Sequence, residues 1–263
     1  MKSKKRKQLF LLIILVSLLF IINYPLLDNA LERFLQDRET VFVERVIDGD
    51  TLVIENKTSV RLLGINSPEK GEIYSKEAQE FLEMITLNKT VELEFGKDKY
   101  DIYNRVLGYI FVNGKNVNLE LVDEGYANFY FPSGRDVYYN KFVRAWEHCI
   151  GNNKNLCEKS KDTCANCIEL KEFDYKNQIV VFSNNCSFDC ELSGWEIKDE
   201  GRKKFIFPEF VLGNKNEVKI NVGEESDNEN VLFWKNEEYV WTKTGDTLFL
   251  RDEKKGLVLW ESY

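Results

Sequence analysis

The chain has 263 residues, of which 43% are hydrophobic and 30% charged, and its formal net charge is −8. This composition allows one large or two small hydrophobic cores and excludes a wholly disordered chain. The negative charge excludes binding of nucleic acid through a broad basic surface, because an acidic protein repels phosphate at long range. Any nucleic-acid binding must therefore come from a local site, and otherwise the acidic balance serves solubility alone.

The first 27 residues have the character of a targeting segment. Five basic residues between Lys2 and Lys7 precede an almost unbroken apolar run from Leu9 to Ile22, which extends to Leu27. Basic charge on the N-terminal flank predicts a membrane helix with its N-terminus inside and the rest of the chain outside. No small-residue cleavage signal follows Ile22, which favours an uncleaved signal-anchor at residues 1–27 over secretion after signal cleavage. A spacer is predicted at residues 28–39.

A β-barrel domain is predicted for residues 40–150. Short β-rich runs are bounded by turn signals such as Asp48-Gly49 and Asn113-Gly114. These runs are Val41–Val46, Thr51–Glu55, Ser59–Ile65, Thr90–Phe95 and Val106–Val112. Apolar residues at helical spacing predict helices at Tyr74–Leu87, Val117–Tyr126 and Val137–His148. We therefore expect a mainly β architecture with a five-stranded OB-fold barrel and three helices.

Residues 151–174 are polar and rich in lysine and cysteine, and they are predicted to be a linker. The chain has six cysteines, all within a window that begins at the end of the predicted barrel domain: Cys149, Cys157, Cys164, Cys167, Cys186 and Cys190. Outside the membrane an even number of cysteines favours disulfides, although the spacing does not choose among the pairings. The alternative is a zinc site built on Cys157, Cys164 and Cys167.

Residues 175–263 are predicted to form a β-sandwich, because short strand-like runs follow one another at regular spacing. The runs are Gln178–Phe182, Trp195–Lys198, Phe205–Phe207, Glu217–Val222, Val231–Trp234, Thr247–Arg251 and Leu257–Trp260. Four tryptophans of this part could form a ligand platform, but burial in the core is favoured. They are Trp195, Trp234, Trp241 and Trp260.

The residues available for chemistry lie in the predicted barrel. A single histidine, His148, excludes sites built on several histidines. Hydrolysis would have to use carboxylates, arginines and a hard metal ion. Three segments offer them: Asp48-Gly49-Asp50-Thr51, the run from Arg61 to Glu69, and the loop from Asp101 to Arg105. Taken alone, Asp48-Gly49-Asp50-Thr51 also fits an ordinary hairpin turn, and Arg61 also fits a structural salt bridge.

Together, in order and spacing, these segments resemble the staphylococcal nuclease (thermonuclease) family. The resemblance implies an OB barrel and Ca²⁺-dependent cleavage of DNA or RNA. It implies that Arg61 contacts the phosphate, that Glu69 activates or positions the attacking water, and that Arg105 stabilises the transition state. These three are the predicted catalytic residues.

The same resemblance implies a metal site. Asp50 matches a calcium ligand, Asn66 and Ser67 stand at two further ligand positions, and Asp48 matches an aspartate just outside the coordination shell. Tyr103 and Tyr130 match tyrosines that contact the nucleotide. The family has a second carboxylate where this chain has Asn66, and a lysine where it has Ile102. Because Ca²⁺ affinity follows ligand charge, we expect weaker metal binding or an altered choice of metal.

The C-terminal part resembles the lamin-tail domain through Leu192–Asp199, Phe205–Pro208 and Gly245–Asp252. This resemblance implies an immunoglobulin-like β-sandwich. Two hypotheses for function follow. The first is a metal-dependent endonuclease that acts on DNA or RNA outside the cytoplasmic membrane. The second is a membrane-tethered nucleic-acid-binding or scaffold module that has kept the fold but not turnover. The sequence implies no protein partner.

Overall fold

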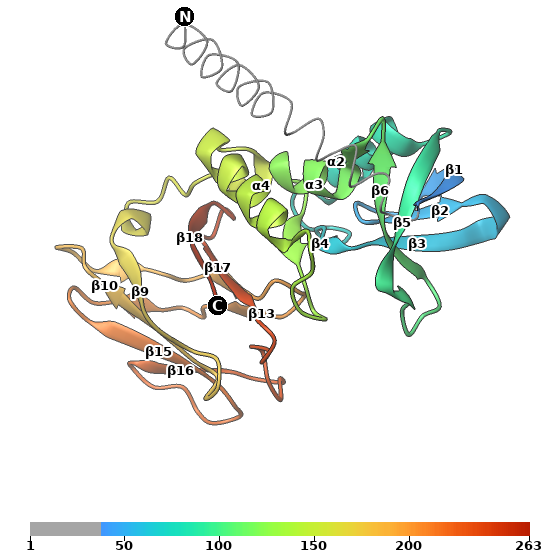
Figure 1. The fold of residues 1–263 in the computed structure, drawn as a ribbon. Coiled ribbons are helices and arrows are strands. Elements are labelled where there is room, and N and C mark those ends of the chain that lie inside the picture. The colour runs from blue at the N-terminus through green and yellow to red at the C-terminus, as the bar shows by residue number, and fades with distance from the viewer. Residues whose placement is uncertain (1–37) are drawn as a thin grey trace, which may run out of the picture.

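The structure is a computed structural model that describes residues 38–263, so the predicted anchor at residues 1–27 lies outside the described part. Within residues 38–263, no helix combines the length and apolar character needed to cross a membrane. Figure 1 shows an N-terminal barrel with helices beside it and a C-terminal β-rich part that packs along one of those helices.

The N-terminal part is the predicted five-stranded closed barrel. Its strands are β1 (Arg38–Val46), β2 (Thr51–Ile54), β3 (Thr58–Leu62), β5 (Thr90–Tyr100) and β6 (Val106–Val112), and the short β7 (Lys115–Asn116) extends the sheet. The strand order is β3-β2-β1-β5-β6-β7, and parallel pairing of β3 with β6 closes the barrel. β1 begins inside the predicted spacer because Arg38 pairs with Glu94 across the sheet and forms ion pairs with Glu92 and Glu94.

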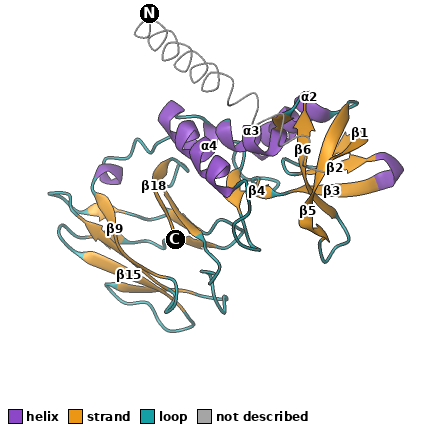
Figure 2. Ribbon diagram, in the orientation of Figure 1, coloured by secondary structure: helices purple, strands orange, loops and turns teal. Residues whose placement is uncertain are grey.

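Three α-helices accompany the barrel, as the sequence predicts (Figure 2). They are α2 (Ser75–Thr86), α3 (Val117–Asp123) and α4 (Tyr139–Asn152). Each presents an apolar stripe to the core; on α4 the buried residues are Phe142, Trp146 and Cys149. This stripe has the i, i+4, i+7 spacing of an amphipathic helix. A 3-10 turn, η1 (Glu55–Lys57), joins β2 to β3.

The predicted strand at residues 59–65 is broken at Leu63. Its second half is β4 (Gly64–Asn66), which leaves the barrel and pairs with β8 (Asn128–Tyr130). Gly64 has a φ of +74°, and a Cβ there would lie 2.9 Å from ring carbons of Phe142. Glycine therefore allows both the turn and the close packing on α4. The break carries Asn66 away from the barrel wall.

The C-terminal part has two four-stranded sheets around a common core. The first contains β9 (Ile168–Asp174), β10 (Ile179–Asn184), β15 (Glu217–Val222) and β16 (Val231–Trp234). The second contains β12 (Glu196–Lys198), β13 (Lys204–Ile206), β17 (Thr247–Arg251) and β18 (Leu257–Ser262). A small ribbon pairs β11 (Cys190–Glu191) with β14 (Val211–Leu212). Trp195, Trp234 and Trp241 are buried in this core and Trp260 packs against the barrel's core, which confirms the core interpretation over a ligand platform.

The segment predicted as a linker is largely ordered. It contains η2 (Asn155–Cys157), η3 (Cys164–Asn166) and β9, which pairs with β10 along most of its length. Its polar, lysine-rich sequence hides this strand because β9 has only one face toward the core. Disulfides join Cys149 to Cys157, Cys164 to Cys190, and Cys167 to Cys186. The disulfide prediction is confirmed, and the zinc alternative is wrong because no cysteine is free.

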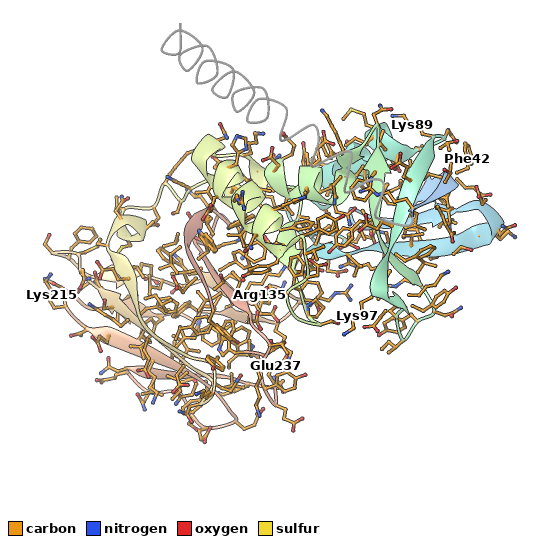
Figure 3. All side chains as sticks on the ribbon, in the orientation of Figure 1. Phe42, Lys89, Lys97, Arg135, Lys215 and Glu237 are labelled. Atoms are coloured by element: carbon orange, nitrogen blue, oxygen red, sulfur yellow. A yellow bond between two sulfur atoms is a disulfide. The ribbon has the colours of Figure 1, made fainter. Side chains whose placement is uncertain are left out.

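The two domains share a hydrophobic core. Phe249 and Leu257, from the C-terminal sheets, belong to the core cluster of the barrel. The Phe249 ring centroid lies 5.3 Å from that of Trp146 and 6.2 Å from that of Phe129. Figure 1 shows β17 and β18 beside α4, and Figure 3 places Arg135 between the two parts. Arg135 Nη2 donates to the carbonyl oxygen of Tyr263 at 2.9 Å. These contacts hold the C-terminal domain against the barrel domain.

Candidate active site at the domain interface

The turn before β2 delivers Asp50 to a buried position. Asp48 Oδ1 accepts a hydrogen bond from the Asp50 backbone N–H at 3.0 Å, which fixes the turn. A Cβ on Gly49 would lie 2.6 Å from Cβ of Ala78 and 2.8 Å from Cβ of Ser67. Glycine is therefore required for the turn to approach both α2 and the chain after β4. Desolvation and the neighbouring Asp50 carboxylate raise the pKa of Asp48. This turn thus brings two carboxylates together.

Asp50 is held by donors from three segments of the chain. Its Oδ2 accepts from the backbone N–H of Ser67 at 2.8 Å and from the Ser67 hydroxyl at 3.0 Å. The same oxygen lies 3.1 Å from Arg61 Nη2, and Oδ1 accepts from the Thr51 hydroxyl at 3.1 Å. Both Asp50 and Ser67 are buried. The structure thus brings together Asp50, Arg61 and Ser67, as the sequence predicts.

Arg61 is buried, with 8% of its surface exposed, and every described contact fixes its guanidinium. Nη1 donates to the carbonyl oxygens of Leu62 at 2.6 Å and Ile65 at 2.9 Å. Nη2 donates to Asn66 Oδ1 at 3.3 Å as well as facing Asp50. The strand ends after Leu62, and both Arg61 and its neighbour Leu62 are buried. The result is a preorganised cation beside a carboxylate.

Asn66 lies between the two domains. Its Nδ2 donates to the carbonyl oxygen of Gly201 at 2.8 Å, while its Oδ1 accepts from Arg61. Only this orientation of the amide places a donor on a carbonyl and an acceptor on a guanidinium, so the neighbours assign it. A carboxylate at this position would face the Gly201 carbonyl oxygen without a proton to share. The C-terminal domain thus gives a physical reason for an amide here.

Glu69 is the predicted catalytic residue that is most open to solvent. Half of its side chain is exposed, and its Oε1 lies 2.7 Å from Nε of Arg202, a residue of the C-terminal domain. Glu72 Oε2 accepts from the Glu69 backbone N–H at 3.0 Å, and Glu72 in turn forms ion pairs with Lys198 and Lys204. The turn that carries Glu69 is therefore held by the second domain.

Arg105 lies apart from this cluster in the described contacts. Its Nε donates to Asp101 Oδ2 at 2.6 Å, and its guanidinium carbon lies 5.5 Å from the Tyr103 ring centroid. Desolvation alone would raise the pKa of Asp101, but hydrogen bonds from Arg105 outweigh it, and the pKa is lowered. Pairing of β3 with β6 sets Arg61 opposite Leu107, so Arg105 precedes the strand that flanks Arg61. Tyr103 has most of its surface exposed, as has Ile102.

Two residues beside Asn66 complete the site. Tyr130 pairs with Gly64, and burial, with the nearby Asp199 carboxylate, raises its pKa. Asn128, which the sequence interpretation missed, pairs directly with Asn66 in the β4–β8 ribbon. Directly paired residues of antiparallel strands point to the same face. The buried Oδ1 of Asn128 has no hydrogen-bond partner in residues 38–263. No local motif marks this residue; pairing with Asn66 is the signal that identifies it.

These residues fit a hard divalent cation. The donors are all oxygens: the Asp50 carboxylate, the Asn66 amide and the groups of Ser67, with the Asp48 carboxylate close by. Calcium prefers such ligands. The unpartnered Asn128 oxygen adds an acceptor that a cation or its bound water would satisfy. Asp50 is the one carboxylate among the three residues that would bind the cation directly, which is consistent with weak rather than tight binding.

Comparison with known proteins agrees with this geometry. Residues 59–159 match the model of the family described as "Staphylococcal nuclease homologue", and residues 163–263 match the "Lamin Tail Domain". A "Thermonuclease" of Staphylococcus intermedius is 31% identical over 130 residues, which cover 46% of this chain and 77% of that protein. The chain belongs to the staphylococcal nuclease family, and a lamin-tail domain follows its nuclease domain.

Two further relatives have the same kind of match. An "Uncharacterized endonuclease" of Haemophilus influenzae is 32% identical over 132 residues, covering 48% of this chain and 69% of that protein. "Endonuclease YhcR" of Bacillus subtilis is 31% identical over 122 residues, covering 39% of this chain and 10% of that protein. All three similarities cover less than half of this chain.

Proposed function

We propose that this protein is a metal-dependent endonuclease that hydrolyses phosphodiester bonds of DNA or RNA. The observation that carries the proposal is the cluster of Asp50, Arg61, Asn66 and Ser67, with Glu69 beside it. Relatives named thermonuclease and endonuclease support the same activity. Burying an arginine among carboxylate and carbonyl oxygens is costly, and a role in a site is one reason for such an arrangement.

Each residue has a role that its surroundings allow. Asp50, Asn66 and Ser67 would hold Ca²⁺, with Asp48 nearby and Asn128 as an added oxygen. The cation would supply charge neutralisation for the phosphate and lower the pKa of water. Arg61 would bind the phosphate, and its four fixed contacts reduce the reorganisation needed in the transition state.

The half-exposed Glu69 carboxylate can accept a proton from water at the open side of the cluster. Arg105, on the loop before β6, would stabilise charge on the leaving oxygen. Tyr103 is exposed, and Tyr130 lies in β8, the strand that pairs with the β4 strand of Asn66. Both tyrosines are therefore available to contact a base.

Metal dependence is tested by a digest of single-stranded DNA and of RNA with purified residues 38–263. We expect turnover with Ca²⁺ and none with EDTA, and restored turnover when Ca²⁺ is returned in excess. Saturable binding of the nucleic acid without any hydrolysis, with Ca²⁺ present, would instead support a tethered binding or scaffold module.

We also propose that the enzyme acts outside the cytoplasmic membrane and is tethered by residues 1–27. The basic and apolar N-terminal sequence supports the anchor, and three disulfides fit an oxidising compartment. Expression of the full chain in a bacterium, followed by fractionation and protease treatment of intact spheroplasts, tests both points. A membrane-bound and protease-accessible protein is expected. Release into the medium would favour signal cleavage, and a protease-protected protein would contradict the proposal.

A further inference from the structure

The turn between β12 and β13, residues 199–203, belongs to the C-terminal domain but lies on the nuclease site. Gly201 accepts a hydrogen bond from Asn66 through its carbonyl oxygen, and Arg202 forms an ion pair with Glu69. Asn66 and Glu69 are a proposed metal ligand and the proposed residue that activates water. The turn is therefore one wall of the site, although its sequence is more than 130 residues from them.

The turn is firmly held, so its position against the site does not depend on Arg202. The Asp199 backbone N–H donates to Lys203 O at 3.1 Å, and Asp199 Oδ1 accepts from the Lys203 backbone N–H at 2.9 Å. Glu200 Oε1 accepts from the Phe131 backbone N–H at 2.9 Å, and the Glu200 N–H donates to Asp246. Gly201 is buried. These contacts keep the backbone in place while the Arg202 side chain extends from it.

The turn also brings positive charge to an acidic chain. The turn and the two strand residues that flank it, residues 198–204, include four basic residues: Lys198, Arg202, Lys203 and Lys204. Lys198 and Lys204 both form ion pairs with Glu72, and Lys203 forms one with Glu237. Three of the four positive charges are therefore paired with carboxylates outside the proposed reaction site. Arg202 differs because its side chain is 68% exposed and its partner is Glu69, a residue of the proposed reaction site.

Arg202 has the geometry of a phosphate contact. A guanidinium carries five N–H donors, and the ion pair with Glu69 uses Nε, so the Nη groups remain for a second acceptor. Arg61 is enclosed by protein oxygens, and Arg105 is bound to Asp101, whereas Arg202 is open to solvent at the edge of the cluster. An incoming strand would meet Arg202 before it reached Arg61.

We propose that Arg202 is a substrate-binding residue supplied by the lamin-tail domain, which contacts a phosphate of the nucleic-acid strand next to the bond that is cleaved. The proposal rests on the proposed nuclease function. The ion pair with Glu69 places Arg202 at the edge of the site in the free protein, and the phosphate is its second partner. The lamin-tail domain is thereby part of the binding site for a single-stranded segment.

Binding of a fluorescent single-stranded oligonucleotide in EDTA, at NaCl from about 50 to about 200 mM, tests this contact without turnover. Loss of one charged hydrogen-bond partner is expected to weaken binding about tenfold in Arg202→Ala. The slope of log affinity against log salt should become shallower by about 0.7, the value for one single-strand phosphate contact. Arg202→Lys should keep the slope and recover part of the affinity, because it keeps the charge.

A matched control is Lys215→Asn, which removes one positive charge from the far side of the C-terminal domain (Figure 3). Asparagine tolerates the positive φ of 62° at that position. This variant should leave the salt slope unchanged. An unchanged slope in Arg202→Ala, or an equal change in Lys215→Asn, would overturn the proposal.

Arg202→Ala also uncovers the Glu69 carboxylate, which would repel phosphate without any contact being lost. The pair of variants Glu69→Gln and Glu69→Gln/Arg202→Ala separates the two effects. We expect the tenfold loss and the slope change to persist in the Glu69→Gln background. If both vanish there, or if Arg202→Ala binds more tightly, Arg202 acts only through Glu69 and the proposal is wrong. The binding assay in EDTA does not depend on turnover. A wild type that binds the oligonucleotide but never hydrolyses it with Ca²⁺ would therefore refute the nuclease function, while this assay would still test the phosphate contact of Arg202.

Discussion

Asn66 Nδ2 donates a hydrogen bond to the carbonyl oxygen of Gly201, 2.8 Å away and 135 residues later in the chain. The asparagine at this proposed metal-ligand position is thus tied to the presence of the second domain. The contact explains why the site has one acidic ligand fewer than its family resemblance implies.

The variant Asn66→Asp tests this explanation. In EDTA its carboxylate faces the Gly201 carbonyl oxygen and lies near Asp50, so we expect the variant to be less stable than the wild type by about 1–3 kcal/mol. Excess Ca²⁺ should stabilise the variant more than the wild type, because the added charge strengthens cation binding. Thermal melts in EDTA and in Ca²⁺ measure both effects. Equal melting temperatures in EDTA would contradict the account of Asn66.

Phe249→Ala tests whether the two domains share one core. Phe249 is fully buried and packs on Trp146 and Phe129 of the nuclease domain. Loss of the ring should destabilise the protein by about 3–5 kcal/mol. Urea unfolding followed by a probe in the barrel and by one in the C-terminal sheets should give coincident transitions that shift together. A shift confined to the C-terminal probe would mean that the domains unfold independently.

Stability should fall as the pH rises from about 4 to about 8. Burial and the Asp246 carboxylate raise the pKa of Asp199 to about 7, and burial raises the pKa of Glu200 to about 8. In the unfolded chain both groups release their protons at lower pH, so the folded state binds more protons within this window. The folded state therefore loses stability as the pH rises through this window.

Urea unfolding at a series of pH values measures this slope. Glu200→Gln should flatten it, because the amide does not titrate. Glu80→Gln, on the exposed face of α2 where Glu80 pairs with Lys76, is the control and should leave the slope as it is. A stability that rises over this range in the wild type would be the opposite of the expected sign.

The disulfide between Cys164 and Cys190 should stabilise the C-terminal domain. It closes a loop with a sequence separation of 26, and both residues are buried in the core of that domain. The double variant Cys164→Ser/Cys190→Ser is expected to lose about 2–4 kcal/mol of unfolding free energy. Denaturant unfolding measures the loss. Mass spectrometry of the wild type should show no free thiol, and zinc bound in place of the disulfides would contradict the assigned pairing.

Local sequence patterns predict much of the fold. The strands at Glu217–Val222, Val231–Trp234 and Thr247–Arg251 have the predicted bounds, because alternation and turn signals are properties of short segments. β9 was missed, since its polar, lysine-containing sequence resembles a linker. The β4–β8 ribbon was missed because it pairs residues about sixty positions apart.

The same contrast between local patterns and long-range pairing applies to the candidate site. Asp50, Arg61 and Ser67 come together as the motif implies, since they lie on adjoining turns and strands of one barrel. Gly201 and Arg202 could not be anticipated, because nothing in a local pattern records which surface of one domain packs on another. Likewise Asn128 gains its place beside Asn66 only through strand pairing.

The role of Glu69 is the central claim, and its most direct test is hydrolysis of single-stranded DNA by Glu69→Gln with Ca²⁺. Glutamine keeps the shape of the side chain but does not accept the proton of the attacking water, so kcat should fall by about 10²–10⁴-fold. The control Glu80→Gln should retain the wild-type rate. A Glu69→Gln protein that hydrolyses DNA as fast as the wild type would contradict the account.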